Sequence, residues 1–467
     1  MTANNRVIRR RTILRSAAGA SALGLVGVTG SAVAQPPSHA GSGSTCDHTV
    51  EPGDSIQAAI NAADDGDTIC IEAGTYEEDL NITRADGLTL RGEGSDVVTI
   101  DASGETGYGI DGVFSNDAWG ADITLEGFTL YGPRQGSPAQ NFGLKVSYID
   151  GLHIEDVVVR ESRRSGIDVF PATDVTITDS RSIDNDANGI AVRNASGVTI
   201  EDVHTENNAW GGLALYAPGD ESVSNVNVQQ CSFSNQPAGV YLEHDDYDNI
   251  SVRDSTFTIP DTVPGQWLHI VFAGGATGRI EGNDLSGAHR VGILARGEGT
   301  EVTIRDNTIV GTGPKTDGWA ENGIQIDQGA TATVSRNTVA DHWWDNTSWA
   351  STGILALGDN IKIQQNEVLG NDVGVWLDHD NCHLNRNEIV VEADGDFPGF
   401  DGVVVEGDRN RLINNDIVGD PDAFSGILLW GSTGTKLINN RIEGFQMEIE
   451  RFGDEGTILP PPFDPAA

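Results

Sequence analysis

Two segments of the chain repeat the same combination of an acidic residue and a histidine. GVYLEHDDYDN begins at Gly239, and GVWLDHDNCHLN begins at Gly374. A histidine beside an acid can accept and donate protons, as general acid–base catalysis requires. Asp378 of the second segment has a counterpart in Glu406, in the similar segment GVVVEGD. Two carboxylates about 5–9 Å apart can cleave a glycosidic bond, and repulsion between them would raise the pKa of one.

A second candidate site lies earlier in the chain and combines a cation with aromatic and acidic groups. Arginine could bind the carboxylate of an acidic sugar while histidine or tyrosine removes the adjacent carbon-bound proton, as in a lyase or an epimerase. This site contains Tyr216, Glu243, His244, His269, Arg296 and Asp327. The candidate catalytic residues of both sites are therefore Glu243, His244, His269, Arg296, Asp327, Asp378 and Glu406.

The strands that carry these residues form a repeat. From Gly143 onward, a glycine followed by alternating apolar residues returns every 21 to 31 residues, as in GIAVR at Gly189 and GILLW at Gly426. A second short strand and an asparagine-containing turn lie between the copies. Alternation with period two predicts β-strands, and a repeat of this length predicts a solenoid. We predict an all-β, single-domain, right-handed parallel β-helix, with coils about 4.8 Å apart and the asparagines stacked in a ladder.

This architecture separates the two opening segments. Five coils lie between Gly239 and Gly374, which is about 24 Å, so the two segments cannot share one catalytic centre. Cys231 and Cys382 are six coils apart and cannot form a disulfide. Cys46 and Cys70 flank the first segment of the chain after its leader, and we predict a disulfide between them.

The outward-facing residues after each glycine predict a binding face. They include arginine, tyrosine, tryptophan and histidine beside acids, with His269 contributed by the degenerate copy WLHIVF. Flat apolar rings and charged groups together suit a polysaccharide, although aromatic stacking could also serve stability alone. The candidate substrate-binding residues are Arg193, Tyr216, Tyr241, Trp319, Trp343, Trp344 and Trp376.

Insertions in the longer repeats support a walled groove. They fall between the asparagine turn and the next glycine strand, and insertions at one corner of a solenoid often border its binding side. These insertions carry five tryptophans, which are Trp267, Trp319, Trp343, Trp344 and Trp349. A tryptophan in a loop needs either an apolar contact or a ligand.

The composition excludes several partners. The chain has 70 acidic and 28 basic residues, a formal charge of −42, and only four lysines among the basic residues. DNA, RNA and anionic membranes are therefore unsuitable partners. The balance resembles that of secreted proteins from salt-loving archaea, in which dense salt screens the charge. We expect a monomer whose partner is a polysaccharide or another glycan.

The N-terminal residues predict export. RRRTILR, from Arg9 to Arg15, resembles a twin-arginine signal, and a weakly apolar run that ends in Ala32-Val33-Ala34 follows it. We predict a signal peptide over residues 1–34, a linker over 35–47, the β-helix over 48–450 and a tail over 451–467. No second apolar span follows before the C-terminus, so we expect an extracellular protein.

A family resemblance lies in the first segments after the leader. GDSIQAAINAADDGD predicts an amphipathic helix that has Asp54 as its N-cap and covers the N-terminal end of the solenoid. The following GDTICIEAGTYEE and NITRADGLTLRGEG resemble the opening coils of pectate-lyase-like and NosD-like right-handed β-helix proteins. The first group implies a polysaccharide lyase or glycoside hydrolase, and the second a non-catalytic protein that binds glycans or a cell surface.

More specific signatures are partial. EHDD at Glu243 and DHDN at Asp378 are similar to the Asp-Pro-His-Asp motif of mannuronan C5-epimerases, but they lack its proline. DND at Asp184 is the nearest approach to the paired aspartates of polygalacturonase-like hydrolases, whose other signatures are missing. A calcium requirement, as in some pectate lyases, stays open, because acids are too abundant here for their clustering to indicate a metal site.

Overall fold

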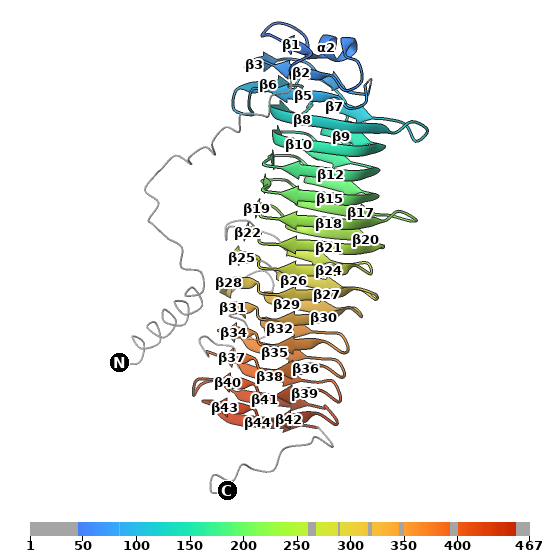
Figure 1. The fold of residues 1–467 in the computed structure, drawn as a ribbon. Helices are drawn as coiled ribbons and strands as arrows, with labels where there is room; N and C mark the ends of the chain where they lie inside the picture. Colours follow the sequence, from blue (N-terminus) through green and yellow to red (C-terminus); the bar gives the residue numbers. More distant parts are fainter. Residues whose placement is uncertain are drawn as a thin grey trace, which may run out of the picture. The chain divides into compact units, whose positions relative to one another are not determined.

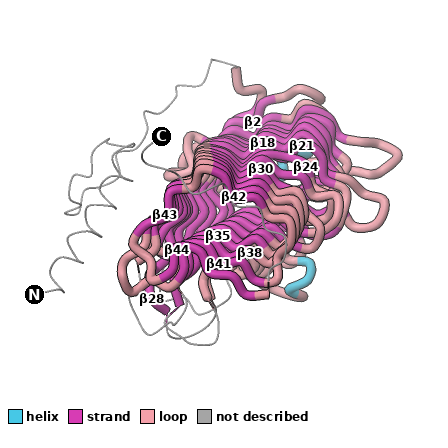
Figure 2. The backbone as a smooth tube through the Cα atoms, turned by 90° about the horizontal axis from the view of Figure 1, so that it is seen from below, coloured by secondary structure: helices cyan, strands magenta, loops and turns pink. Residues whose placement is uncertain are grey.

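The structure is a computed structural model that describes residues 45–83, 85–259, 268–287, 290–315, 320–344, 350–392 and 400–453. Contacts divide the chain into Met1–Thr45 and Cys46–Ala467, and the second unit contains all the described strands. In this unit, short parallel strands stack coil upon coil from the blue N-terminal end to the red C-terminal end (Figure 1). Viewed from below, strands of successive coils lie over one another (Figure 2).

Fifteen strands form one parallel sheet, which we call the glycine sheet because most of its strands contain the recurrent glycine. Its strands are β4 (Leu80–Asn81), β7 (Tyr108–Val113), β9 (Phe142–Ser147), β11 (Ile167–Val169), β14 (Asn188–Arg193), β17 (Gly211–Ala217), β20 (Ala238–His244), β23 (Leu268–Phe272), β26 (Val291–Arg296), β29 (Asn322–Asp327), β32 (Thr352–Ala356), β35 (Val373–Leu377), β38 (Asp401–Val405), β41 (Ser425–Trp430) and β44 (Met447–Phe452).

A 29-stranded sheet forms the rest of each coil and consists of two rows that share the long strands β8 (Gly120–Tyr131) and β10 (Ile149–Arg160). Row 1 follows the glycine sheet in each coil. Its other strands are β1 (His48–Val50), β2 (Thr68–Ile71), β5 (Thr89–Gly92), β12 (Ala172–Thr178), β15 (Ala195–Glu201), β18 (Val223–Gln229), β21 (Tyr247–Arg253), β24 (Thr277–Glu281), β27 (Glu301–Arg305), β30 (Thr331–Ser335), β33 (Lys362–Gln364), β36 (His383–Asn385), β39 (Arg411–Ile413) and β42 (Lys436–Ile438).

Row 2 completes each coil and leads back to the next glycine strand. Its other strands are β3 (Gly74–Tyr76), β6 (Val98–Asp101), β13 (Arg181–Ile183), β16 (His204–Glu206), β19 (Ser232–Ser234), β22 (Thr256–Ile259), β25 (Asp284–Gly287), β28 (Thr308–Lys315), β31 (Thr338–Trp344), β34 (Glu367–Leu369), β37 (Glu388–Val390), β40 (Asp416–Val418) and β43 (Arg441–Glu443). The predicted all-β parallel solenoid is confirmed, with about fifteen turns.

The interior of the solenoid is a column of stacked aliphatic side chains. Ile293, Ile324, Ile354, Val375 and Val403 pair in register on successive glycine-sheet strands, and none is exposed. The glycine beside this column is required by close approach. A Cβ on Gly374 would lie 2.4 Å from the Ile389 side chain and 2.6 Å from the Gly402 carbonyl oxygen.

The predicted asparagine ladder is present at the corner between rows 1 and 2. Each buried asparagine side chain donates from Nδ2 to the Oδ1 of the next, with distances of 2.9 or 3.0 Å, and the same Oδ1 also accepts from the preceding asparagine's backbone N–H. The ladder consists of Asn283, Asn307, Asn337, Asn366, Asn387, Asn415 and Asn440. Cys231 and Ser255 occupy the same corner in earlier coils, where the backbone N–H of Cys231 donates to Ser255 Oγ.

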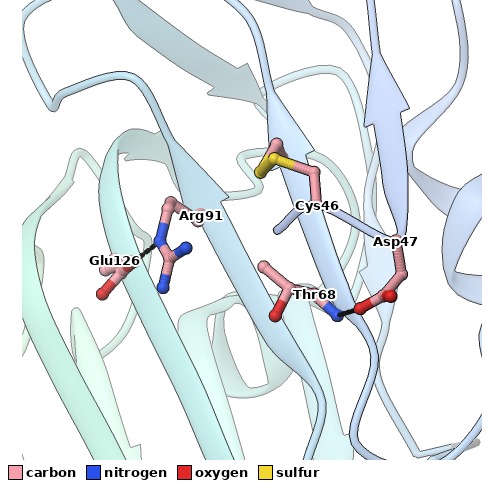
Figure 3. Close-up of a disulfide and its surroundings, with 6 residues drawn as sticks. Cys46, Asp47, Thr68, Arg91 and Glu126 are labelled. Carbon is pink, nitrogen blue, oxygen red and sulfur yellow. Dashed lines mark hydrogen bonds and ion pairs between the residues drawn. A yellow bond between two sulfur atoms is a disulfide. The ribbon is translucent and has the colours of Figure 1, made fainter. Parts of the chain in front are cut away.

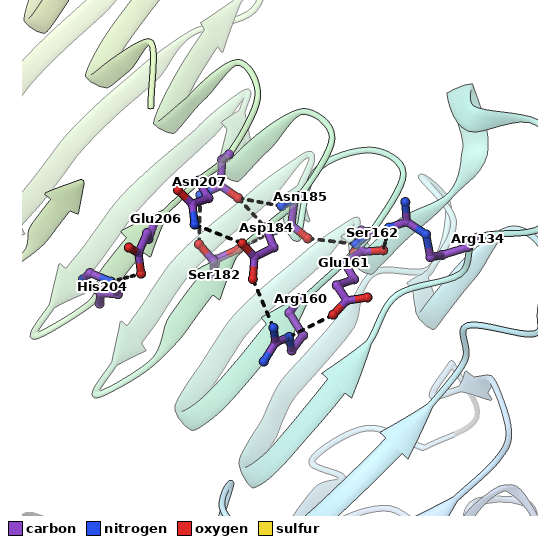
Figure 4. Close-up of polar contacts among 11 residues, drawn as sticks. Arg134, Arg160, Glu161, Ser162, Ser182, Asp184, Asn185, His204, Glu206 and Asn207 are labelled. Carbon is purple, nitrogen blue, oxygen red and sulfur yellow. Dashed lines mark hydrogen bonds and ion pairs between the residues drawn. The ribbon is translucent and has the colours of Figure 1, made fainter. Parts of the chain in front are cut away.

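A second ladder lies at the corner before the glycine sheet. Asn185 Oδ1 accepts from the backbone N–H of Ser162, and its Nδ2 donates to Asn208 Oδ1 at 2.9 Å (Figure 4). Asp184 instead points outward, where it contacts Arg160 and Asn207. The DND segment is therefore a turn whose central residue is structural, rather than a pair of catalytic aspartates.

Helix α2 (Ile56–Ala62) lies near β1, β2 and β4 at the N-terminal end of the stack (Figure 1). Its N-cap is Ser55, whose side chain accepts from the Ala58 N–H at 3.1 Å, so the prediction that Asp54 caps the helix is wrong. Glu78, from a later segment, accepts from the first-turn N–H groups of Ile56 and Gln57. A carboxylate from outside the helix thus supplies the negative charge expected at its N-terminus.

The predicted disulfide between Cys46 and Cys70 is present, with a Cα–Cα distance of 5.6 Å (Figure 3). It joins the segment before β1 to β2, where Asp47 also accepts from the Thr68 N–H at 2.9 Å. Cys231 and Cys382 are free and buried, as their separation predicts. Burial raises the pKa of Cys231 to about 12 and that of Cys382 to about 11, so both thiols stay protonated.

Asn337→Ala should destabilise the solenoid by about 2–4 kcal/mol, because it removes four hydrogen bonds and leaves the buried backbone N–H of Asn307 without its acceptor. Denaturant unfolding in concentrated salt measures the change. Gln364→Ala is the control, since this amide side chain is half-buried and makes no hydrogen bond within the described residues. Equal effects of the two substitutions would show that the ladder contributes no special stability.

Candidate functional site

The glycine sheet presents two outward columns of side chains, and the strand register places the predicted residues in them. Arg193, Tyr216 and Glu243 are Cα partners on β14, β17 and β20, and Arg296 is the partner of Asp327 on β26 and β29. In the other column, Trp376 on β35 lies between Leu355 and Val404. The face is therefore continuous, but its polar residues fall into separate groups.

His269 does not lie on this face, which corrects the prediction. Val240 and Tyr241 pair with Ile270 and Val271, so His269 takes the place of the recurrent glycine. Its side chain is 1% exposed, and its ring lies 6.0 Å from that of Phe257. Burial lowers the pKa of His269 to about 3, with a further contribution from His342. The alternation of WLHIVF was assigned two residues out of register, because it contains no glycine to mark its start.

Tyr216 and Tyr241 form a closed group with Asn188. The two hydroxyls lie 2.8 Å apart, Asn188 Nδ2 donates to Tyr216 at 2.9 Å, and the Tyr241 hydroxyl donates to Asn188 Oδ1 at 2.8 Å. Burial raises the pKa of both tyrosines. They therefore stay protonated and suit binding by hydrogen bonds, rather than the proton removal considered for Tyr216.

The Arg193 side chain already has binding partners within the protein. Its guanidinium makes two hydrogen bonds of 2.5 Å to Glu221 and lies 4.2 Å from the ring centre of Phe170. Lys145 pairs with Asp168 on the preceding strands and lies 5.1 Å from the Phe142 ring. These residues make a surface of paired charges and aromatic rings on β9, β11 and β14. The sequence prediction did not include Lys145, because only the strand register brings it beside Asp168.

Glu243 and His244 are both exposed at the end of β20. His244 Nδ1 lies 2.6 Å from the backbone oxygen of Glu243, and its ring is 6.2 Å from that of Tyr216. His244 has φ of 86°, a left-handed conformation that is uncommon for a non-glycine residue. The histidine is thus held by the backbone of a turn, as a structural role predicts.

Arg296 and Asp327 form an ion pair of 3.6 Å between Nε and Oδ1. Asp327 is 8% exposed, and its other oxygen accepts from Gln325 at 2.8 Å. One coil without a charged residue in this column separates the pair from Glu243, because Phe272 on β23 pairs with Ala295, which places Ala273 beside Arg296. The second candidate site therefore divides into two groups and has no shared histidine.

Asp378 and Glu406 are brought together, as predicted. They follow Leu377 and Val405, which are Cα partners on β35 and β38, and the Glu406 N–H donates to the Leu377 oxygen at 2.9 Å. Burial raises the pKa of Glu406, and the charge of Asp378 and a hydrogen bond with it raise the pKa further, while Trp376 opposes the shift. His379 Nδ1 lies 2.9 Å from Asp378. Among the described residues, this carboxyl pair offers the arrangement best suited to acid–base chemistry.

Of the five tryptophans of the insertions, two lie within the described residues. Trp319 lies outside the described residues, as do Trp267 and Trp349, and for Trp344 only its backbone place in β31 is described. Trp343 also lies in β31 and is 5% exposed, so its predicted place in a loop wall is wrong. The described ends of the insertions do lie between row 2 and the glycine sheet, for example between β28 and β29.

Asp401 is an unusual group that sequence reasoning missed. It stands directly before Gly402, is 5% exposed, and accepts from the Ser425 N–H at 3.0 Å. Burial raises its pKa from 3.8 to about 7. The sequence does contain a signal for this group, because Asp401 is an acid at a position where the neighbouring strands have Val373 and Ser425.

In the described part of the chain, no three His, Cys, Asp or Glu side chains converge in a way that could hold a metal ion. No helix there is long and apolar enough to cross a membrane.

The chain belongs to the family described as right-handed beta helix region, which matches residues 85–263 and 268–442. No curated protein matches the sequence. Similar solved structures include the A-module of a mannuronan C-5 epimerase from Azotobacter vinelandii, with 18% identity over 87% of this chain and 95% of that chain, and a TM-score of 0.37.

Two further structures are similar at the same level. One is the catalytic unit of a GH87 alpha-1,3-glucanase from Streptomyces thermodiastaticus, with 14% identity, 86% of this chain and 65% of that chain covered, and a TM-score of 0.41. The other is a tailspike protein of E. coli bacteriophage HK620 in complex with a pentasaccharide, with 13% identity, 86% and 76% covered, and a TM-score of 0.44.

Asp401→Asn should stabilise the protein at high pH. Because the folded-state pKa is raised to about 7, the wild-type carboxyl favours folding below about pH 4, and this contribution is lost as pH rises through 7. The variant should therefore be more stable than the wild type at pH 8, on the order of 2 kcal/mol, and similar near pH 4. Thermal melts across this range measure the difference, and a gain that is independent of pH would contradict the assignment.

Proposed function

We propose that this protein cleaves a polysaccharide on its glycine sheet, with Asp378 and Glu406 as the acid–base pair. The observation that carries the proposal is that these carboxyls, on consecutive coils, interact closely enough for one to raise the pKa of the other. Glu406, with the raised pKa, is suited to keep a proton and donate it to a leaving oxygen. Asp378, beside His379, is suited to act as the base.

Neighbouring residues fit a sugar chain. Trp376 precedes Asp378 by two residues on the same face and offers a half-buried aromatic ring, which suits the apolar face of a sugar. The two carboxyls follow paired residues on adjacent strands, whose spacing of about 4.8 Å lies near the lower end of the separation used in glycoside hydrolysis, roughly 5–9 Å. A substrate between them would part the side chains, after which either water attack or elimination next to a uronate carboxylate could follow.

Glu406→Gln and Asp378→Asn should each lower the cleavage rate at least about 100-fold, because each removes one partner of the proton transfer. A panel of neutral and acidic polysaccharides, incubated in concentrated salt, distinguishes the reactions: new reducing ends alone report hydrolysis, and ultraviolet absorbance of unsaturated uronates reports elimination. Glu388→Gln is the matched control. Glu388 also has a pKa raised by burial and by acids on adjacent coils, but it lies in row 2.

A non-catalytic glycan-binding protein is the second candidate, favoured by the tyrosine and arginine groups on β9 to β20. Their side chains are held by one another and offer a fixed polar and aromatic surface. Retention of several glycans with no cleavage by the wild type would support this function and contradict the enzymatic one.

We also propose that the protein is exported through the twin-arginine pathway and functions in concentrated salt, with α2 covering the N-terminal end of the solenoid. The disulfide between Cys46 and Cys70 supports an oxidising compartment. The charge of −42 supports the salt requirement, because self-repulsion destabilises a folded chain when it is not screened.

The melting temperature should rise markedly between about 0.1 M and 1 M NaCl, where the screening length falls from about 10 Å to 3 Å. Sucrose at matched osmolality is the control, since it stabilises proteins by exclusion without screening charge. An equal rise in sucrose would show that repulsion is not the cause.

A further inference from the structure

A column of cations runs along row 1 in the C-terminal coils. Lys362 on β33 is the Cα partner of His383 on β36, which pairs with Arg411 on β39, which in turn pairs with Lys436 on β42. Four basic side chains therefore stand on four consecutive coils, and we call them the basic ladder. At the spacing of parallel strands, the basic ladder spans roughly 14 Å along the stack.

The basic ladder has no acid on its own strands, and Asp359, Asp380 and Asp408 lie three residues before Lys362, His383 and Arg411. Its four strands read KIQ, HLN, RLI and KLI, and none of these residues is acidic. The chain as a whole has 70 acids and only four lysines, two of which belong to the basic ladder. Like charges on adjacent strands destabilise a sheet. The four stacked basic residues therefore lower the stability of the fold, which favours a functional reason for their presence.

The cations of the basic ladder are not used in ion pairs. Lys362, Arg411 and Lys436 form no ion pair or side-chain hydrogen bond with any described residue. Nearby arginines behave differently, since Arg409 pairs with Asp380 at 2.6 Å and Arg441 pairs with Asp416 at 2.9 Å. The basic ladder is thus set apart even from cations in the same coils.

The electrostatic environment of His383 confirms the local excess of positive charge. Its pKa is lowered by burial and by the charges of Arg411 and Lys362, with no acid acting in the opposite direction. Lys362, His383 and Arg411 are exposed, and Lys436 is half-buried. Gln364 and Asn385 lie two residues after Lys362 and His383 on the same face, and their side-chain amides make no hydrogen bond to a described residue.

A linear array of free cations, flanked by free amides, matches an extended polymer with repeated anionic groups. One small anion would need only two of these residues. Nucleic acid has a far denser charge, one per about 1.7 Å of duplex, and would be repelled by the remainder of a chain with charge −42. A polysaccharide with one anionic group per sugar unit carries fewer charges, and its hydroxyls can use the amides.

We propose that the basic ladder binds a polysaccharide that carries carboxylate or sulfate groups along its length. The site lies on row 1, on the strands that follow the carboxyl pair in each coil, so it would tether the polymer beside the pair rather than cleave it. This inference rests on the glycan-directed function proposed above, but not on the chemistry of Asp378 and Glu406.

The test compares two arginines that each open a three-residue strand, one on row 1 and one on row 2. Arg411 opens β39, read RLI, and Arg181 opens β13, read RSI; both are exposed, and neither forms an ion pair with a described residue. Affinity electrophoresis of the full chain in gels that contain polygalacturonate, dextran sulfate or neutral dextran measures retention at several salt concentrations. Arg411→Gln should weaken binding to an anionic polymer about threefold, and Lys362→Gln with Arg411→Gln about tenfold, whereas Arg181→Gln should have less than half that effect.

Each outcome is decisive. Polygalacturonate and dextran sulfate distinguish a carboxylate from a sulfate preference, and retention that falls with salt supports the proposal. Equal losses in the Arg411 and Arg181 variants would show an effect of net charge alone, and equal retention in neutral dextran would overturn the anionic specificity. The basic ladder could instead pair with an acidic column of a second copy, formed by Glu367, Glu388 and Asp416. A doubled mass in sedimentation that the same variants abolish would show this pairing and overturn the proposal. Retention is scored separately from new reducing ends and unsaturated uronates, so failure of this proposal and failure of the catalytic proposal can be told apart.

Discussion

The parallel hydrogen bonds between successive coils are the interaction on which the remaining structure depends. Each strand is placed by its partner one coil earlier, so a side chain's neighbours in space are the residues at the same place in the adjacent repeats. The aliphatic column and the asparagine ladder use this rule in the interior. The Asp378 and Glu406 pair and the basic ladder use the same rule on the surface. One geometric repeat therefore provides both stability and sites.

Because of the same rule, the stability of the solenoid depends on which side chains are stacked at equivalent positions of successive coils. Identical side chains in register add favourably when they are apolar or can donate and accept, as amides do, and unfavourably when they carry one charge. Glu388 illustrates the cost, because acids on both neighbouring coils raise its pKa. Several other cations relieve such repulsion, as Arg336 does with Asp306. The basic ladder departs from this pattern, and the departure is what makes it a candidate binding surface.

The polar face of the glycine sheet also shows how stacking limits function. Tyr216, Tyr241 and Asn188 satisfy one another, and Arg193 is held by Glu221. Such groups can recognise a ligand without changing protonation. Acid–base chemistry needs instead a group whose pKa is shifted, and Glu406 after β38 provides this because burial and the neighbouring Asp378 raise its pKa.

The repeat alone was enough to predict the parallel solenoid, the asparagine ladder and the adjacency of Asp378 and Glu406, because period and register are local properties of a sequence. The Cys46–Cys70 disulfide was predicted instead from the expected export of the chain and the place of the two cysteines. Tertiary structure decided what depends on exact register or on neighbours across the coil. His269 lies in a glycine position, and Ser55 rather than Asp54 caps the helix. Trp343 and Asp401 are both buried. Tertiary structure also aligned Lys362, His383, Arg411 and Lys436, since repeats of unequal length hide a column that only hydrogen-bonded strands bring together.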